Sequence, residues 1–257
     1  MDFEIKNEQG FQYVEQGQGP VLLLLHGLFG ALSNFEEVID YFSDKYRVII
    51  PLMPIYTKSK HGASVDGLSE FVHNFVTFKG LDDMIVLGNS LGGHTGLIYT
   101  LAHPQKVKLL VLTGSSGLYE TGLGSGFPKR SSYEYIQERV GYTFYSQETA
   151  TKELVDEVFD ILNDNFKTLR ILRIARSAQR HYMGSEIVNI EVPTLLIWGL
   201  NDNITPPRVA HEFAKLLPNS ELHFIDKCGH AAMMEQPALF NEILAKFLDK
   251  HLQAVAQ

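Results

Sequence analysis

Short, continuously apolar segments recur along the chain and alternate with longer segments in which apolar residues return every three or four positions. The short segments have the length of strands buried on both faces, and the longer ones are typical of amphipathic helices. The predicted strands cover residues 21–25, 47–50, 84–87, 107–112, 194–198 and 221–225, and predicted helices cover 65–76, 92–102, 206–217 and 237–252. This alternation predicts an α/β fold with a doubly wound, mostly parallel sheet.

Two local patterns near the start of the chain refine this prediction. Residues 3–5 and 11–14 alternate apolar and polar positions around a turn at residues 7–10, which predicts an antiparallel hairpin at a sheet edge. Ser33 and Glu36 have the spacing of a capping box, so we expect a helix that begins at Ser33.

The strand–helix alternation stops after residue 117 and resumes near residue 190. The intervening segment opens with a glycine-rich connector at Gly122–Gly126 and then has helical spacing, without a strand signal, at residues 132–140, 146–162 and 166–183. We therefore expect a helical lid at residues 118–189, inserted into a core formed by residues 1–117 and 190–257. Where the alternation resumes, Thr205 is the expected N-cap of the helix that follows it.

Composition narrows the class of protein. The chain has 257 residues and a net charge of −8, which disfavours nucleic acid and anionic membrane surfaces as main partners. The apolar run Val21–Leu25 is far too short to span a bilayer, and the first residues lack the pattern of a signal peptide. Cys228 is the only cysteine, so no intrachain disulfide can form. We expect a cytoplasmic protein without stable membrane insertion, of unspecified oligomeric state.

The pentapeptide Gly88-Asn89-Ser90-Leu91-Gly92 lies between the predicted strand 84–87 and the predicted helix 92–102. A serine at a sharp strand-to-helix turn is the signature of a nucleophile elbow. Its glycines let the strand and the helix approach closely, and the helix N-terminus favours negative charge that develops near the serine. Ser90 is therefore the candidate nucleophile.

A serine hydroxyl needs a base to take its proton and a third group to orient that base. His230 is the candidate base because it follows the last predicted strand, at the edge where the sites of parallel sheets collect. Asp202 is the candidate acid because it follows strand 194–198 and lies between the serine and the histidine in the chain. Asp226 is the second choice, since it lies only four residues before His230.

The same chemistry needs an oxyanion hole with two donors. The backbone N–H of Leu91, directly after the nucleophile, is one candidate, and the N–H of Leu28, in the loop after strand 21–25, is the other. His26 precedes this loop and is expected to hold it by hydrogen bonding. Neither a cofactor nor a metal ion is expected.

Four motifs together resemble the α/β-hydrolase superfamily over nearly the whole chain. They are His26-Gly27-x-x-Gly30, Gly88-Asn89-Ser90-Leu91-Gly92-Gly93, Trp198-Gly199-x-x-Asp202 and Cys228-Gly229-His230. The resemblance implies the triad Ser90, Asp202 and His230, with a helical lid over the pocket.

Within this superfamily the chain is most similar to the carbon–carbon bond hydrolases of aromatic ring-cleavage pathways. The similar strings are residues 88–93, Ser33-Asn34-Phe35 and residues 227–231. Those enzymes act on vinylogous diketones that bear a carboxylate, and the resemblance implies that Asn34 and Asn89 help to bind the substrate. The loop at residues 26–30 and Ala231 replace a glycine-rich loop and a tryptophan that are usual in that group, and both fit a general esterase equally well.

Basic residues recur at steps of three and four along the predicted helix 166–183, at Lys167, Arg170, Arg173, Arg176 and Arg180. Arg173 and Arg176 are our candidates for an inward-facing clamp on a substrate carboxylate. The alternative, which we favour, is a solvated basic face. Aromatic residues in the same region are expected to pack within the lid and partly to line an apolar pocket.

The sequence thus predicts a cofactor-free serine hydrolase that cleaves a small carboxylic ester through an acyl-enzyme. Its substrate is expected to be a small molecule with an apolar acyl or aromatic part. The first alternative is a carbon–carbon bond hydrolase that acts on carboxylate-bearing vinylogous diketones. Two others are a small-molecule receptor on the same fold, with slow or absent turnover, and a cofactor-independent perhydrolase.

Overall fold

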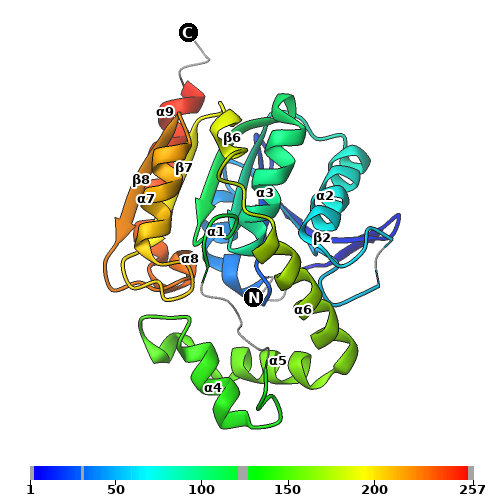
Figure 1. Cartoon of the computed structure of the whole chain (residues 1–257). Helices are drawn as coiled ribbons and strands as arrows, with labels where there is room; N and C mark the ends of the chain where they lie inside the picture. The colour runs from blue at the N-terminus through cyan, green and yellow to red at the C-terminus, as the bar shows by residue number, and fades with distance from the viewer. Residues whose placement is uncertain (1–2, 30–31, 59, 121–126, 254–257) are drawn as a thin grey trace.

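The computed structural model describes residues 3–29, 32–58, 60–120 and 127–253, and an eight-stranded sheet forms its centre (Figure 1). The strands are β1 (Lys6–Glu8), β2 (Phe11–Gln16), β3 (Val21–Leu25), β4 (Arg47–Pro51), β5 (Met84–Asn89), β6 (Val107–Thr113), β7 (Thr194–Gly199) and β8 (Ser220–Ile225). Their order is β1-β2-β4-β3-β5-β6-β7-β8, and all pairs from β4 to β8 are parallel. The predicted doubly wound, mostly parallel sheet is confirmed.

Helices cover both faces of this sheet. They are α1 (Glu36–Phe42), α2 (Val65–Lys79), α3 (Leu91–Ala102), α7 (Pro207–Leu216), α8 (Ala232–Glu235) and α9 (Pro237–Gln253). In Figure 1, α2, α3 and α7 lie on one face, and α1 and α9 lie together on the other. The central strands are therefore buried on both sides, which explains their continuously apolar sequences. Within the described ranges, no helix combines the length and apolar composition needed to cross a membrane.

Three more helices lie between β6 and β7 in the chain: α4 (Tyr133–Gly141), α5 (Lys152–Asn163) and α6 (Asn165–Arg180). Each begins where a polar side chain, of Ser132, Thr151 or Asp164, accepts a hydrogen bond from a backbone N–H of the first turn. Figure 1 shows α4 and α5 beyond the carboxyl ends of the strands, with α6 running back to the core. The lid role of residues 118–189 stays a prediction, and the connector at Gly122–Gly126 lies outside the described residues.

Short 3-10 helices complete the described elements, at η1 (Ser33–Phe35), η2 (Pro104–Lys106), η3 (Gln147–Thr149) and η4 (Ile187–Asn189). The first of these shows that the predicted capping box is wrong, because α1 begins only at Glu36 and no side chain caps it. The predicted cap at Thr205 is also wrong, since Pro206 is the N-cap residue of α7. The Thr205 hydroxyl donates instead to Asp202 Oδ2 at 2.8 Å.

The edge hairpin is shifted from its predicted position. The prediction placed the first strand at residues 3–5, whereas β1 begins at Lys6 and ends at Glu8. Gln9 and Gly10 have φ values of 47° and 85°, and positive φ at both central residues is the requirement of a type I′ turn. The turn is therefore tighter than the predicted four-residue turn, and the strands continue up to it.

The first turn of α3 approaches β3 so closely that a side chain has no room at Gly92. A Cβ there would lie 1.9 Å from the Leu25 carbonyl oxygen, whereas a Cβ on Gly96 would lie 3.4 Å from the Val86 side chain. Because the obstacle at Gly92 is backbone, we expect Gly92→Ala to lower the free energy of unfolding by about 3 kcal/mol or more. The matched control, Gly96→Ala, should change it by no more than about 1 kcal/mol. Denaturant unfolding measures both, and equal stabilities would contradict the steric argument.

Candidate active site

Ser90 lies at the turn between β5 and α3 with φ 53° and ψ −119°. A positive φ in a residue with a side chain costs on the order of 1–3 kcal/mol and persists only where the surroundings enforce it. Here the Ser90 N–H donates to the Thr113 carbonyl at 3.1 Å, and its carbonyl accepts from the Ser116 N–H at 3.2 Å. This conformation presents the side chain at the carboxyl edge of the sheet, at the N-terminus of α3.

Asp202 and His230 form a buried hydrogen-bonded pair. Asp202 follows β7 and His230 follows β8, and the distance from Asp202 Oδ2 to His230 Nδ1 is 2.9 Å. Asp202 Oδ1 accepts hydrogen bonds from the backbone N–H groups of Ile204 and Thr205, at 2.8 and 2.9 Å. The carboxylate is thus held toward the imidazole. With Nδ1 engaged, Nε2 is the ring nitrogen available to a group in the cavity that His230 and Ser90 both line.

Burial and neighbouring carboxylates act in opposite directions on His230. Burial lowers the pKa of its imidazole, because a low dielectric disfavours the charged form. The charge and hydrogen bond of Asp202, assisted by Glu120 and Glu235, outweigh burial and raise the pKa above its ordinary value. An imidazole held in one tautomer beside a carboxylate has the properties of a general base.

Glu235 ties the loop of His230 to the segment after α4. Its Oε1 accepts from the Gly229 N–H at 2.8 Å, and its Oε2 accepts from the Tyr145 N–H at 2.7 Å. The His230 N–H donates to the Thr143 carbonyl at 2.9 Å. Sequence reasoning missed Glu235, because a glutamate at the end of the short helix α8 belongs to no motif.

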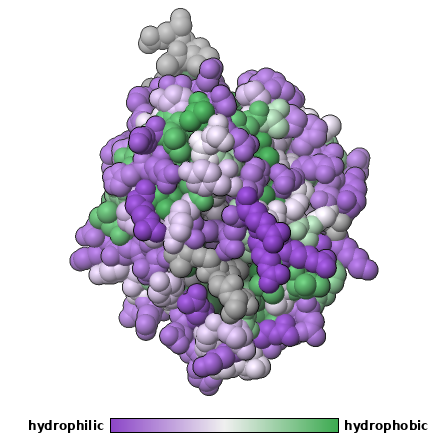
Figure 2. All heavy atoms as spheres, viewed as in Figure 1, coloured by the Kyte–Doolittle hydropathy of each residue, from purple (hydrophilic) through white to green (hydrophobic). Residues whose placement is uncertain are grey.

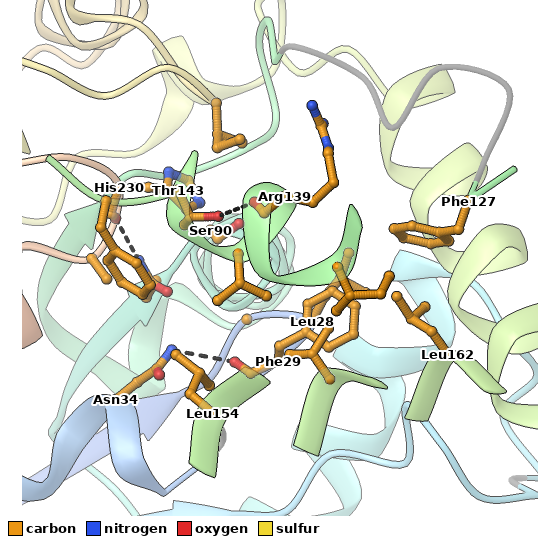
Figure 3. A pocket seen from close by; sticks show the side chains of 18 residues that line it. Leu28, Phe29, Asn34, Ser90, Phe127, Arg139, Thr143, Leu154, Leu162 and His230 are labelled. Carbon is orange, nitrogen blue, oxygen red and sulfur yellow. Dashed lines mark hydrogen bonds between the residues drawn. The ribbon is translucent and has the colours of Figure 1, made fainter. Parts of the chain in front are cut away.

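The cavity between the sheet and the helices after β6 has a volume of about 170 Å³ (Figure 3). Its polar lining includes Ser90 and His230, and most of the remainder is apolar. Leu154, Val158 and Leu162 recur every four residues, so one face of α5 forms part of the wall. The full apolar lining is Leu28, Phe29, Phe127, Ile136, Val140, Phe144, Leu154, Val158, Leu162, Ile204 and Ala231. Such a cavity suits a small ligand with an apolar or aromatic part.

Leu91 directly follows Ser90 in the chain, and Leu28 lines the same cavity as Ser90. Leu91 is the first residue of α3, so its N–H has no partner within the helix. Leu28 lines the cavity, and a Cβ on the preceding Gly27 would lie 3.4 Å from Ser90 Cβ. An oxyanion hole requires two backbone donors beside the nucleophile, and this role of Leu28 and Leu91 stays a prediction.

Asn34 and Asn89 also line the cavity, but their amide groups bind the backbone. Asn34 Nδ2 donates to the Phe29 carbonyl at 3.2 Å. Asn89 Nδ2 donates to the Thr113 carbonyl at 3.1 Å and to the His230 carbonyl at 3.4 Å. Both side chains therefore stabilise the loops of the site, and their contact with substrate stays a prediction.

Arg173 and Arg176 lie on an exposed basic face, as the favoured alternative expects, and the candidate clamp at these residues is wrong. Both side chains are exposed and line a separate surface hollow with Arg180 and His181, away from Ser90. The apolar positions of α6 face inward and turn these arginines outward. The arginine that does line the cavity is Arg139, on α4. Sequence reasoning missed it, because the basic spacing on α6 drew attention to the other helix.

Cys228 lies beside this site but is fully buried. Burial, followed by the charges of Glu235 and Asp202, raises the pKa of its thiol, which disfavours a reactive thiolate. In the part of the chain that the structure describes, no three His, Cys, Asp or Glu side chains are placed to hold a metal ion.

The sequence pattern of the alpha/beta hydrolase fold family matches residues 20–134 and 129–237. The chain belongs to this family. The matched ranges include Ser90, Asp202 and His230. Relatives that match most of this chain are named hydrolases.

Individual relatives extend the comparison. A 2-hydroxy-6-oxononadienedioate/2-hydroxy-6-oxononatrienedioate hydrolase from Cupriavidus pinatubonensis is 30% identical over 250 residues, which are 88% of this chain and 86% of the relative. An α/β hydrolase from the sediment metagenome of the Mar Chica lagoon, Morocco, is 42% identical, with a TM-score of 0.79 over 96% of this chain and 98% of the other. A meta-cleavage product hydrolase from Pseudomonas fluorescens has a TM-score of 0.83 at 21% identity, over 96% and 97%, and shows the shared fold. The predicted resemblance to carbon–carbon bond hydrolases is confirmed.

The Asp202–His230 pair leads to a prediction about pH. In the wild type the pKa of His230 lies above its ordinary value of 6.5. In Asp202→Asn the main opposing charge is lost while burial still disfavours the imidazolium, so this pKa should fall below 6.5. Histidine resonances followed by NMR across pH 4–9 measure this shift. The exposed Asp226 supplies the control, and Asp226→Asn should leave the pKa of His230 unchanged. If the pKa of His230 falls in Asp226→Asn but not in Asp202→Asn, then Asp226, and not Asp202, is the partner of His230.

Proposed function

We propose that this chain is a serine hydrolase that cleaves a carbon–carbon bond in small ketones bearing a carboxylate, with Ser90 as nucleophile, His230 as base and Asp202 as its orienting acid. The observation that carries the proposal is the buried Asp202–His230 pair at a cavity that also contains the strained serine. The names of the sequence relatives support this bond type over ester cleavage, which was our first expectation.

The reaction begins when Ser90 Oγ attacks the substrate carbonyl carbon and its proton passes to His230 Nε2. The carbonyl oxygen becomes an oxyanion that accepts from the N–H groups of Leu28 and Leu91. Asp202 stabilises the imidazolium that has formed. Loss of one such oxyanion donor typically raises the barrier by about 2.7–4 kcal/mol.

The carbon–carbon bond then breaks as the carbonyl re-forms. This step uses the diketo tautomer of the substrate, in which the electron pair is delocalised onto the second keto oxygen. That oxygen takes the proton from His230, and the fragment leaves as a dienol. His230 next removes a proton from water, and the resulting hydroxide attacks the acyl-enzyme. The acyl group leaves as a carboxylic acid, and Ser90 regains its proton.

A carboxylate on the substrate has a counter-charge available. Arg139 lines the cavity, and its guanidinium lies 5.2 Å from the centre of the Tyr142 ring. Figure 3 shows its side chain extending from α4, away from Leu154 and Asn34. The Arg139 side chain is exposed, so we assign it a substrate carboxylate that reaches the solvent side of the cavity, and we assign the conjugated or aromatic part to the apolar wall of α5. Residues 118–189 accordingly form the lid, and residues 1–117 and 190–257 form the core.

Ester cleavage is the second candidate function, because the same acyl-enzyme forms from an ester. The small side chain of Ala231, next to His230 in the lining, and the apolar wall leave room for an alkyl ester. In that case the leaving alcohol takes the proton from His230.

Parallel assays of one enzyme preparation test this proposal. We expect the wild type to bleach the chromophore of a 2-hydroxy-6-oxo-hexa-2,4-dienoate substrate, and Ser90→Ala to lose about 10⁴-fold or more in kcat. Ser33→Ala removes an exposed hydroxyl outside the cavity and should retain full activity. p-Nitrophenyl butyrate is assayed alongside as the ester.

The outcomes separate the candidates. Turnover of the ester alone would select the second function. Tight binding of both compounds without turnover would favour a receptor, and equal rates in the wild type and Ser90→Ala would refute the serine mechanism.

A further inference from the structure

The backbone at Leu28 is fixed from outside the cavity. The Gly27 carbonyl accepts a hydrogen bond from His26 Nδ1 at 2.9 Å, and the Leu28 carbonyl accepts one from the Tyr56 hydroxyl. These two carbonyls belong to the peptide groups on either side of the Leu28 Cα. Because each peptide group is planar, fixing both planes fixes the direction of the Leu28 N–H.

His26 is held in a single tautomer for this task. The Met53 N–H donates to His26 Nε2 at 2.9 Å, so Nε2 is the acceptor and Nδ1 carries the hydrogen that reaches the Gly27 carbonyl. Burial lowers the pKa of His26 to about 4, which keeps the ring neutral at ordinary pH. The Gly27 carbonyl and the Leu28 N–H form one peptide group, and donation to its oxygen polarises that group and strengthens the N–H as a donor.

Tyr56 comes from the same segment as Met53, just after β4. Burial, together with the charge of Glu157, raises the pKa of its hydroxyl, so the group stays protonated and donates to the Leu28 carbonyl. One short segment therefore holds the loop at two points, through His26 and through the Leu28 carbonyl.

A side chain of α6 holds this segment through hydrogen bonds. Arg170 is buried, and its Nε donates to the Ile55 carbonyl at 3.1 Å. Its Nη2 donates to the Pro54 carbonyl at 2.6 Å and to the Gly62 carbonyl at 3.4 Å. A buried guanidinium needs such acceptors, because leaving its donors unpaired would be costly. The contacts run without a break from α6, through residues 54–56, to Leu28.

We propose that Arg170 and Tyr56 are positioning residues. Through them, the packing of α6 on the core orients the Leu28 N–H, the oxyanion donor. The inference rests on the proposed function, in which the Leu28 N–H binds the oxyanion. Neither side chain lines the cavity, so neither is expected to contact the substrate. Releasing the segment misaligns a donor that acts only in the transition state, and substrate binding in the apolar cavity is left intact.

Tyr56→Phe is the sharpest variant, because it removes one hydroxyl and keeps the ring. We expect kcat to fall by about 10- to 100-fold with KM within about twofold of the wild type. Affinity for a trifluoromethyl ketone, which forms a tetrahedral adduct with the serine, should fall by the same factor as kcat/KM. Tyr182→Phe is the matched control: it removes an exposed hydroxyl that donates to Glu212 at 2.8 Å, and both constants should stay unchanged.

Arg170→Met tests the other end of the chain of contacts. It should lower kcat in the same way, and the double variant with Tyr56→Phe should lose little more than the poorer single variant, because both changes break one path. Arg180→Gln removes an exposed arginine from the same helix and serves as the control. If the fold-losses in kcat of the two single variants multiply in the double variant, the proposed path is overturned.

The amide chemical shift of Leu28, followed by NMR, gives a readout that does not depend on turnover. We expect this shift to change in Tyr56→Phe and in Arg170→Met, which release the peptide groups around Leu28, and to stay unchanged in Tyr182→Phe and Arg180→Gln. An unchanged shift would overturn the inference, and so would an active enzyme whose kcat and ketone affinity are the same in Tyr56→Phe as in the wild type. If the shift changes but the wild type turns over neither substrate class, the proposed function fails and the positioning role stands.

Discussion

The site depends on the close approach of α3 to the sheet at Ser90. A Cβ on Gly88 would lie 2.5 Å from the Gly93 Cα, so the strand and the helix approach too closely there for a side chain on Gly88. This contact forces Ser90, which lies between the strand and the helix, into a backbone conformation with positive φ. A residue with a side chain would otherwise avoid that conformation. The pairing of β5 with parallel strands on both sides stabilises that geometry. The remaining groups of the site can then come from strand ends that the sheet has already aligned.

Sequence patterns were sufficient wherever structure depends on local periodicity or on chain order. Buried strands are continuously apolar, and the glycines around Ser90 mark a turn that few other residues could form. The pairing of Asp202 with His230 could be predicted because β7 and β8 end at the same edge of the sheet, which brings the two side chains together. The choice over Asp226 rested on reach, and the exposed position of that residue agrees with it.

The errors arose where tertiary contacts outweigh local preference. Thr205 has the side chain of a helix cap, but a buried carboxylate one turn away competes for its hydroxyl. For α6 the pattern predicted the helix but not its rotation, since steps of three and four fit two neighbouring faces equally well. Arg170 lies one turn from Arg173, yet the first is buried and the second is exposed. That difference follows from how the helix packs, and no spacing in the sequence reports it.

The hydrogen bonds of Arg170 to the carbonyls of Pro54, Ile55 and Gly62 also limit how freely this region could be exchanged between related enzymes. Helices between β6 and β7 form much of the cavity wall, so they are the natural segment to swap when a new specificity is wanted. A transplanted segment without the arginine would leave the Pro54 and Ile55 carbonyls without their donor. The unit of exchange is therefore discontinuous: the loop after β4 has to travel with the helices, although more than one hundred residues separate them in the chain.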